Sequence, residues 1–145
     1  MVAGRLFYDI YTVKSDTWDD IKVFDKKGGR SGESLVSVRE NGVVIISAAA
    51  TRDMALRENR SKYAILAYSA KNRAVLLQFH PNEAPNTVKL MYGKTSVSFA
   101  GKLFFQSNSV DIKSIKGKYR PKMIEIPNFG PCWAIFLGEE IGGAL

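Results

Sequence analysis

The ten residues from Lys113 to Lys122, KSIKGKYRPK, contain four lysines, one arginine and one tyrosine, and no acidic residue. Cations attract the phosphates of a nucleic-acid strand, and an aromatic ring can stack on an exposed base. This combination predicts a surface that holds a polyanion, single-stranded nucleic acid above all. The structural alternative is a solvated basic loop whose tyrosine packs half-buried against the protein.

A similar basic-aromatic signature occurs earlier in the chain, where residues 60–63 (RSKY) align with residues 116–119 (KGKY). In both places a helix-like segment leads into an expected strand. If the two segments lie on related surfaces, they form one basic groove with an aromatic residue in each half. The residues predicted to bind nucleic acid are Arg57, Arg60, Lys62, Tyr63, Lys94, Lys102, Lys113, Lys116, Lys118, Tyr119, Arg120 and Lys122.

The net charge of +7 is unevenly distributed along the 145 residues. Residues 1–33 contain six cations and six acids, residues 34–138 contain fifteen cations and six acids, and residues 139–145 contain two acids. Basicity confined to one part of a chain favours a polyanionic partner for that part. The pattern predicts an N-terminal extension with a glycine-rich linker over 1–33, a basic core domain over 34–138 and an acidic C-terminal tip over 139–145.

The expected fold is α+β, a single β-rich domain preceded by an N-terminal β-hairpin extension. Short runs of β-branched and aromatic residues, separated by Gly, Asn and Pro, indicate strands and turns. Asn41-Gly42 suits a hairpin turn, and Ser47 is a candidate N-cap for a helix over residues 48–56. Strands are expected over 34–39, 43–47, 62–69, 74–79, 87–92, 97–99, 116–126 and 132–137, with a second helix over 100–110.

The order of these elements suggests an internal repeat. Each unit reads as strand, short helix, strand, turn and strand, and residues 46–49 align with residues 97–100. Internal duplication is one interpretation, and independent β-rich segments that resemble one another are the other. If duplication is correct, Tyr63 and Tyr119 occupy matching positions in the two units.

Residues suited to catalysis or metal binding are few. His80 is the only histidine and Cys132 the only cysteine, so neither a disulfide framework nor a zinc site is expected. The apolar setting of Cys132 predicts a buried, unreactive thiol. Asp16, Asp19 and Asp20 read as turn or cap residues. We therefore expect no catalytic site, no metal and no cofactor, and a protein that is not an enzyme.

Residues 42–79 carry one family resemblance. Gly42, an apolar strand over 43–46, a short helix over 48–56 and a closing strand over 74–79 follow one another. This order resembles the half-unit of the AbrB and MraZ swapped-hairpin DNA-binding fold. The resemblance implies duplex recognition and a role in transcription. Members of that family usually begin this helix after a proline, whereas this chain has Ser47-Ala48.

The character of the whole chain is similar to that of small phage-type single-stranded DNA-binding proteins, which are compact, β-rich and basic with an acidic tail. Here GEEIGGAL places Glu139 and Glu140 ahead of Ile141 and Leu145. The similarity implies that the tip contacts a protein partner in replication or recombination. A frayed terminus is the alternative.

Three functions follow as hypotheses. The first is a DNA-binding protein that prefers single strands, has little sequence preference and acts in replication or transcription. The second is an AbrB-like duplex-binding regulator, and the third is a protein-interaction module without nucleic acid. Exposed strand edges favour a homo-oligomer. The lack of a long apolar run and of an apolar signal core predicts a cytoplasmic protein without membrane contact.

Overall fold

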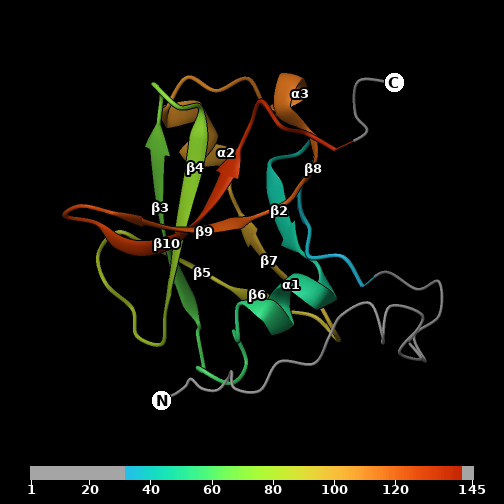
Figure 1. The fold of residues 1–145 in the computed structure, drawn as a ribbon, viewed down its shortest axis with the longest axis vertical. Helices are drawn as coiled ribbons and strands as arrows, with labels where there is room; N and C mark the ends of the chain where they lie inside the picture. Colours follow the sequence, from blue (N-terminus) through green and yellow to red (C-terminus); the bar gives the residue numbers. More distant parts are fainter. Residues whose placement is uncertain (1–31, 142–145) are drawn as a thin grey trace, which may run out of the picture. The chain divides into compact units, whose positions relative to one another are not determined.

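The computed structural model describes residues 32–141, so the N-terminal hairpin predicted within residues 1–33 lies outside the described residues (Figure 1). The described part is β-rich with three short helices, as expected for a mostly β member of the α+β class. The strands are β1 (Val36–Val38), β2 (Val43–Ile46), β3 (Tyr63–Ser69), β4 (Ala74–His80), β5 (Thr87–Lys89), β6 (Met91–Tyr92), β7 (Val97–Ala100), β8 (Gly117–Tyr119), β9 (Lys122–Ile126) and β10 (Gly130–Phe136). The helices are α1 (Ala48–Asp53), α2 (Lys102–Ser107) and α3 (Ile112–Ile115).

The strands form two five-stranded antiparallel sheets. The first sheet has the order β6-β7-β2-β1-β8, and the second has the order β5-β3-β4-β10-β9. Within the described residues the chain crosses from one sheet to the other three times. One crossing runs through α1 from β2 to β3, and the other two are bends, at Leu90 from β5 to β6 and at Arg120-Pro121 from β8 to β9. Each bent segment therefore pairs at one end with the first sheet and at the other end with the second, which ties the two sheets together along both margins.

Three expected elements differ from the structure. The strand predicted over 87–92 is divided into β5 and β6, because the chain changes sheets at Leu90. The strand predicted over 116–126 is divided, because the chain changes sheets at Arg120-Pro121, and a proline supplies no N–H for a continuous ladder. The helix predicted over 100–110 is shorter, since α2 ends at Ser107, and α3 follows as a separate single turn that was not predicted, where the Asp111 carboxylate accepts a hydrogen bond from the Lys113 backbone N–H at 3.3 Å. The bend matters for the candidate site, because it turns the basic residues around Tyr119 across two sheets.

Four strands in each sheet keep the same pairing when the two expected units are exchanged. In the first unit β1–β2 and β3–β4 are hairpins on either side of α1, and in the second β6–β7 and β9–β10 are hairpins on either side of α2 and α3. The units meet through the β2–β7 and β4–β10 pairs. The outer strands break this symmetry, because β8 pairs with β1 and β5 pairs with β3, whereas β6 and β9 are edge strands that lack a corresponding neighbour among the described residues.

The tyrosines of the two units do not, however, occupy matching positions. Tyr63 is the first residue of β3, is half-buried, and lies opposite His80 and Lys89. Tyr119 is the last residue of β8, is fully buried, and lies opposite Val36. The expectation that the two Lys-Tyr pairs are equivalent is therefore wrong.

Local sequence explains how the first unit begins. Gly42 adopts a φ of +89° in the β1–β2 turn, and a Cβ atom there would lie 2.6 Å from the Cβ atom of Lys102. Glycine is thus required both by the backbone angle and by the close approach of α2. The Ser47 hydroxyl caps α1 by accepting a hydrogen bond from the Ala50 N–H at 3.1 Å, as predicted.

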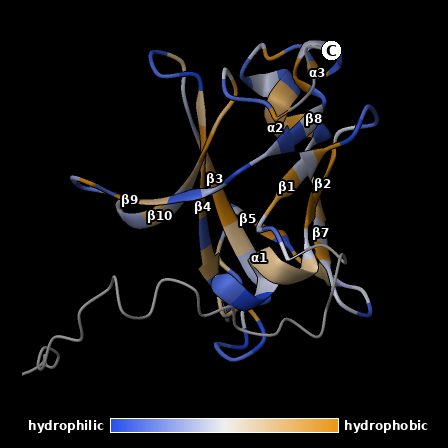
Figure 2. Ribbon diagram, turned by 45° about the vertical axis from the view of Figure 1, so that its right-hand side comes forward, coloured by the Kyte–Doolittle hydropathy of each residue, from blue (hydrophilic) through white to orange (hydrophobic). Residues whose placement is uncertain are grey.

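The core lies between the two sheets. Alternate residues of the first sheet face it, including Val36 and Val38 of β1 and Val97 and Phe99 of β7. Apolar stretches of the two sheets face each other in Figure 2, while hydrophilic residues gather at the loop tips. Tyr119 is among the largest side chains of this core, which fixes the position of β8.

Candidate nucleic-acid interface

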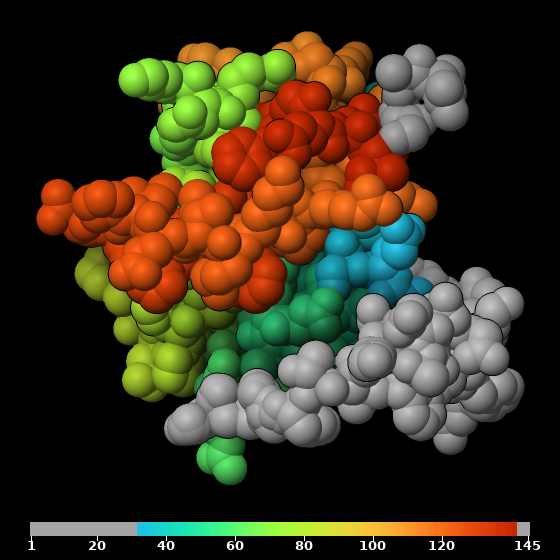
Figure 3. All heavy atoms as spheres, in the orientation of Figure 1, coloured from blue at the N-terminus to red at the C-terminus, as the bar shows by residue number. Residues whose placement is uncertain are grey.

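The C-terminal basic stretch, Lys113–Lys122, runs along α3, β8 and the start of β9. In Figure 3 the segment that includes β8, β9 and β10, coloured orange to red, forms a band across one face of the molecule. Three of its five cations pair with acids. Lys116 lies 3.5 Å from Glu40, and Lys122 lies 2.9 Å from Glu139. The third pair joins Arg120 to Glu33.

These ion pairs are exposed, since every side chain involved keeps at least half of its surface in solvent. Such pairs contribute about 0–1 kcal/mol to stability and weaken as salt is added. These ion pairs affect the binding of a polyanion more than they affect stability, because each carboxylate cancels the charge of the cation beside it. Most of the positive charge that the sequence places in this stretch is therefore compensated locally.

Tyr119 is not a stacking platform, which corrects the sequence prediction. Its side chain is about 1% exposed, and its hydroxyl donates a hydrogen bond to the Ile115 carbonyl oxygen. Burial, with a smaller contribution from Glu140, raises the pKa of Tyr119 to about 12. A ring enclosed by the core cannot reach a base, so the tyrosine of this stretch is structural.

The acidic tip is attached to this stretch over its first residues. Glu139 pairs with Lys122, and the Ile141 N–H donates to the Lys118 carbonyl oxygen at 2.8 Å. The Glu140 side chain occupies the space that a Cβ atom at Gly117 would need, and the φ of +146° at Gly117 also favours glycine. Residues 142–145 lie outside the described residues. The described part of the tip contacts the protein's own basic stretch.

Arg57, in the other basic signature, is part of a folded contact. Its guanidinium donates hydrogen bonds to the carbonyl oxygens of Gly93 and Lys94, at 3.1 and 3.3 Å. The guanidinium carbon lies 4.9 Å from the centroid of the Tyr92 ring, within the range of a cation–π contact. Arg57 therefore joins the segment after α1 to the turn after β6, two regions that lie side by side in Figure 1.

Five cations line two hollows that share Arg57, and Tyr92 lines one of them; we call this group the basic patch. Arg57, Arg60, Lys62 and Tyr92 line a hollow of about 320 Å³. Arg52, Arg57 and Lys94 line a second hollow of about 200 Å³. The basic patch consists of Arg52, Arg57, Arg60, Lys62, Tyr92 and Lys94.

The charge of the basic patch is not compensated in the same way. Among residues 32–141, no carboxylate lies within 4.0 Å of a basic-patch cation, and Glu58 is the one acid that lines either hollow. Tyr92 is 37% exposed, and its hydroxyl donates to the Ser61 carbonyl oxygen, with the Leu56 carbonyl oxygen as a second acceptor at 3.3 Å. Burial raises the pKa of Tyr92, although Arg57 lowers it. The ring is thus held in place, and part of it is in solvent.

The predicted residues therefore divide into separate groups. Arg57, Arg60, Lys62 and Lys94 come together in the basic patch, whereas Lys102 begins α2 beside Gly42. Tyr63 points to the outer face of the second sheet, in register with His80. Sequence reasoning missed Tyr92 as a site residue. The sequence pattern that could have indicated Tyr92 is its position at the end of a strand, immediately before the basic turn that contains Gly93 and Lys94.

The residues considered for catalysis have ordinary surroundings. Cys132 is buried and free, which confirms the predicted buried position, and burial raises the pKa of its thiol. The His80 ring nitrogen lies 3.4 Å from the Gln78 amide oxygen. Within the described range 32–141, no three His, Cys, Asp or Glu residues are grouped closely enough to hold a metal ion.

No family model, curated protein or solved structure matches this chain. Residues 42–79 fold as β2, α1, β3 and β4, the order on which the AbrB-like resemblance was based. Over the part of the chain that the structure describes, no helix is long and apolar enough to span a membrane. The function must therefore be inferred from the surface itself.

Proposed function

We propose that the protein binds single-stranded nucleic acid, with single-stranded DNA favoured, through the basic patch. The observation that carries this proposal is the group of cations around the partly exposed Tyr92, none of which is paired with a carboxylate of a described residue. Cations would follow the phosphates, and the tyrosine would supply a stacking surface for a base. Both interactions tolerate any sequence, so little sequence preference is expected.

The short helices support single strands over a duplex. A helix that reads duplex DNA normally lies in the major groove and presents several side chains to base edges. Here α1 has six residues and buries Ala49, Ala50 and Thr51, so few side chains remain for a groove. The patch instead combines a basic loop with a ring, which suits an unpaired strand. This is a binding role, in replication or transcription, and not an enzymatic one.

The shared pairing of four strands in each sheet favours an origin by internal duplication, whereas the unlike positions of Tyr63 and Tyr119 oppose it. Self-association is also part of the proposal. It is based on β6, an edge strand of the first sheet that carries the exposed side chain of Met91, because an unpaired strand edge can pair with a second copy. A cytoplasmic location suits the free thiol of Cys132.

A titration of a fluorescent oligothymidylate at several salt concentrations tests the function. The logarithm of affinity should fall linearly with the logarithm of salt, with a slope of about −0.7 for each phosphate neutralised. A duplex of the same length should bind more weakly under the same conditions. Binding that does not change with salt, or the absence of binding at micromolar protein, would show that the basic patch does not hold nucleic acid.

A further inference from the structure

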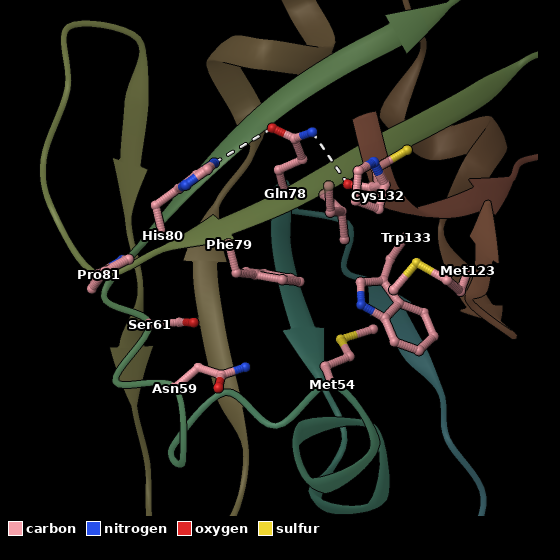
Figure 4. A pocket seen from close by; sticks show the side chains of 12 residues that line it. Met54, Asn59, Ser61, Gln78, Phe79, His80, Pro81, Met123, Cys132 and Trp133 are labelled. Atoms are coloured by element: carbon pink, nitrogen blue, oxygen red, sulfur yellow. Dashed lines mark hydrogen bonds between the residues drawn. The ribbon is translucent and has the colours of Figure 1, made fainter. Parts of the chain in front are cut away.

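A hollow of about 480 Å³ opens next to the basic patch, between the segment after α1 and the second sheet (Figure 4). Aromatic and thioether side chains dominate its wall, namely those of Met54, Phe79, Met123 and Trp133. Trp133 lies in register between Leu77 and Met123, so these side chains share one face of the sheet. We call this site the aromatic hollow. Its volume lies within the range of about 300–1,000 Å³ that is typical of small-ligand sites.

Two polar side chains face this apolar wall without a described partner. Ser61 is 4% exposed, and its hydroxyl makes no hydrogen bond to another residue of the described range. Figure 4 shows this hydroxyl directed into the hollow, with the Asn59 amide beside it. The exposed side-chain amide of Asn59 also makes no hydrogen bond to another described residue. Buried hydroxyls are usually bonded, so an unbonded one that faces a hollow indicates a ligand or water as its partner.

The same short segment also forms the edge of the basic patch. Asn59 and Ser61 line the aromatic hollow, whereas Arg60 and Lys62 line the hollow around Tyr92, and Ser61 contributes to both. Alternate residues of one segment thus present hydrogen-bonding groups to an apolar site and cations to a charged one. A nucleotide has this division, with a planar ring at one end and a phosphate at the other.

We propose that the aromatic hollow receives an unpaired nucleobase of the strand whose phosphates lie on the basic patch. The base would stack on Trp133, with thioether contacts from Met54 and Met123. The Asn59 amide has both donor and acceptor atoms and the Ser61 hydroxyl can do either, so together they can bond the edge of any base. This inference rests on the proposed function for its phosphate contacts, but the hollow can be tested by itself.

The fluorescence of Trp133 can report whether a base occupies the aromatic hollow. The chain has two tryptophans, and Trp18→Phe leaves Trp133 as the only one. In that background, oligothymidylate should quench the fluorescence of Trp133 as it binds. An abasic strand of the same length should still bind in a salt-dependent way, but without quenching and about 5- to 150-fold more weakly for each base that can no longer stack.

Two variants locate the base. Asn59→Ala and Met123→Ala change exposed side chains of the hollow, and both should weaken oligothymidylate binding several-fold while the abasic strand binds as before. Leu103→Ala is the matched control, because Leu103 is 78% exposed on α2 and does not line the hollow. Its affinity for both strands should equal that of the parent. Thermal melts establish that each variant is folded.

The outcomes separate the two proposals. If oligothymidylate binds without quenching Trp133, or if the abasic strand quenches equally, the aromatic hollow is not a base site, although the basic patch still binds strands. If neither strand binds, the proposed function fails, and thymidine alone decides the question of the hollow. Quenching of Trp133 by thymidine would then retain the hollow as a base site, and no change would overturn it.

Discussion

The two basic regions contain equal numbers of cations and differ in what surrounds them. The C-terminal basic stretch has three of its five cations paired with carboxylates, and its tyrosine is enclosed by the core. The basic patch has no such pair within the described residues, and its tyrosine is partly in solvent. A high local count of lysine and arginine therefore does not identify a binding surface. Charge compensation and the exposure of the ring decide which region can hold a strand.

The largest expected effect distinguishes the roles of the two tyrosines. Tyr119→Ala removes a fully buried ring from the core and should lower the free energy of unfolding by about 3–5 kcal/mol. Tyr119→Phe keeps the ring and removes only the hydrogen bond to Ile115, so its cost should be about 1–3 kcal/mol. Urea denaturation of both variants measures these values. A folded Tyr119→Ala protein of parental stability that binds strands poorly would restore Tyr119 as a site residue.

Tyr92 should give the opposite result. Tyr92→Ala removes an exposed ring from the basic patch, so affinity for oligothymidylate should fall by about 1–3 kcal/mol with an almost unchanged salt slope. Tyr92→Phe retains the ring and should bind nearly as well as the parent, provided that Arg57 keeps its position over it. Fluorescence anisotropy measures both affinities. Parental binding by Tyr92→Ala would exclude stacking on this ring.

A smaller effect should appear when the C-terminal basic stretch is released from its acids. Glu33→Gln with Glu139→Gln leaves Arg120 and Lys122 uncompensated, and each broken ion pair should change stability by less than about 1 kcal/mol. If a strand then reaches these cations, the salt slope should become steeper by about 0.7 for each additional phosphate that they neutralise.

The control for this experiment is Glu83→Gln with Glu125→Gln, which makes the same change in net charge at acids that form no ion pair within the described residues. Its salt slope should match that of the parent. An equally steeper slope in both double variants would mean that net charge, and not local pairing, governs binding.

Local features of the fold were predictable from the sequence because neighbouring residues determine them. Asn41-Gly42 predicted the first turn, and Ser47 predicted the start of α1, and both predictions are confirmed. The bends at Leu90 and at Arg120-Pro121 were missed, because the apolar pattern of a strand does not show a change of sheet. The core that encloses Tyr119 likewise depends on strands that are distant in sequence.

The difference between the two basic regions could not be predicted either, because it depends on contacts between residues that are distant in the sequence. Glu33 and Arg120 are 87 residues apart, and Glu139 reaches Lys122 across a hairpin, so only the folded chain shows the compensation. The cation–π contact between Arg57 and Tyr92 likewise joins residues that are distant in the sequence. Four of the five basic-patch cations were predicted from the sequence as binding residues. The C-terminal basic stretch, which contains more lysines, was nevertheless predicted as the main binding site.

The most direct measurement compares two triple variants that remove equal charge. Arg60→Ala, Lys62→Ala and Lys94→Ala change the basic patch and leave Arg57 to hold the turn, whereas Lys116→Ala, Arg120→Ala and Lys122→Ala change the C-terminal basic stretch. In titrations with oligothymidylate, the magnitude of the salt slope should fall by about 2 in the patch variant, at about 0.7 for each phosphate that is no longer neutralised, and the stretch variant should retain the parental slope. A parental slope in the folded patch variant, together with a reduced slope in the stretch variant, would contradict the assignment of binding to the basic patch.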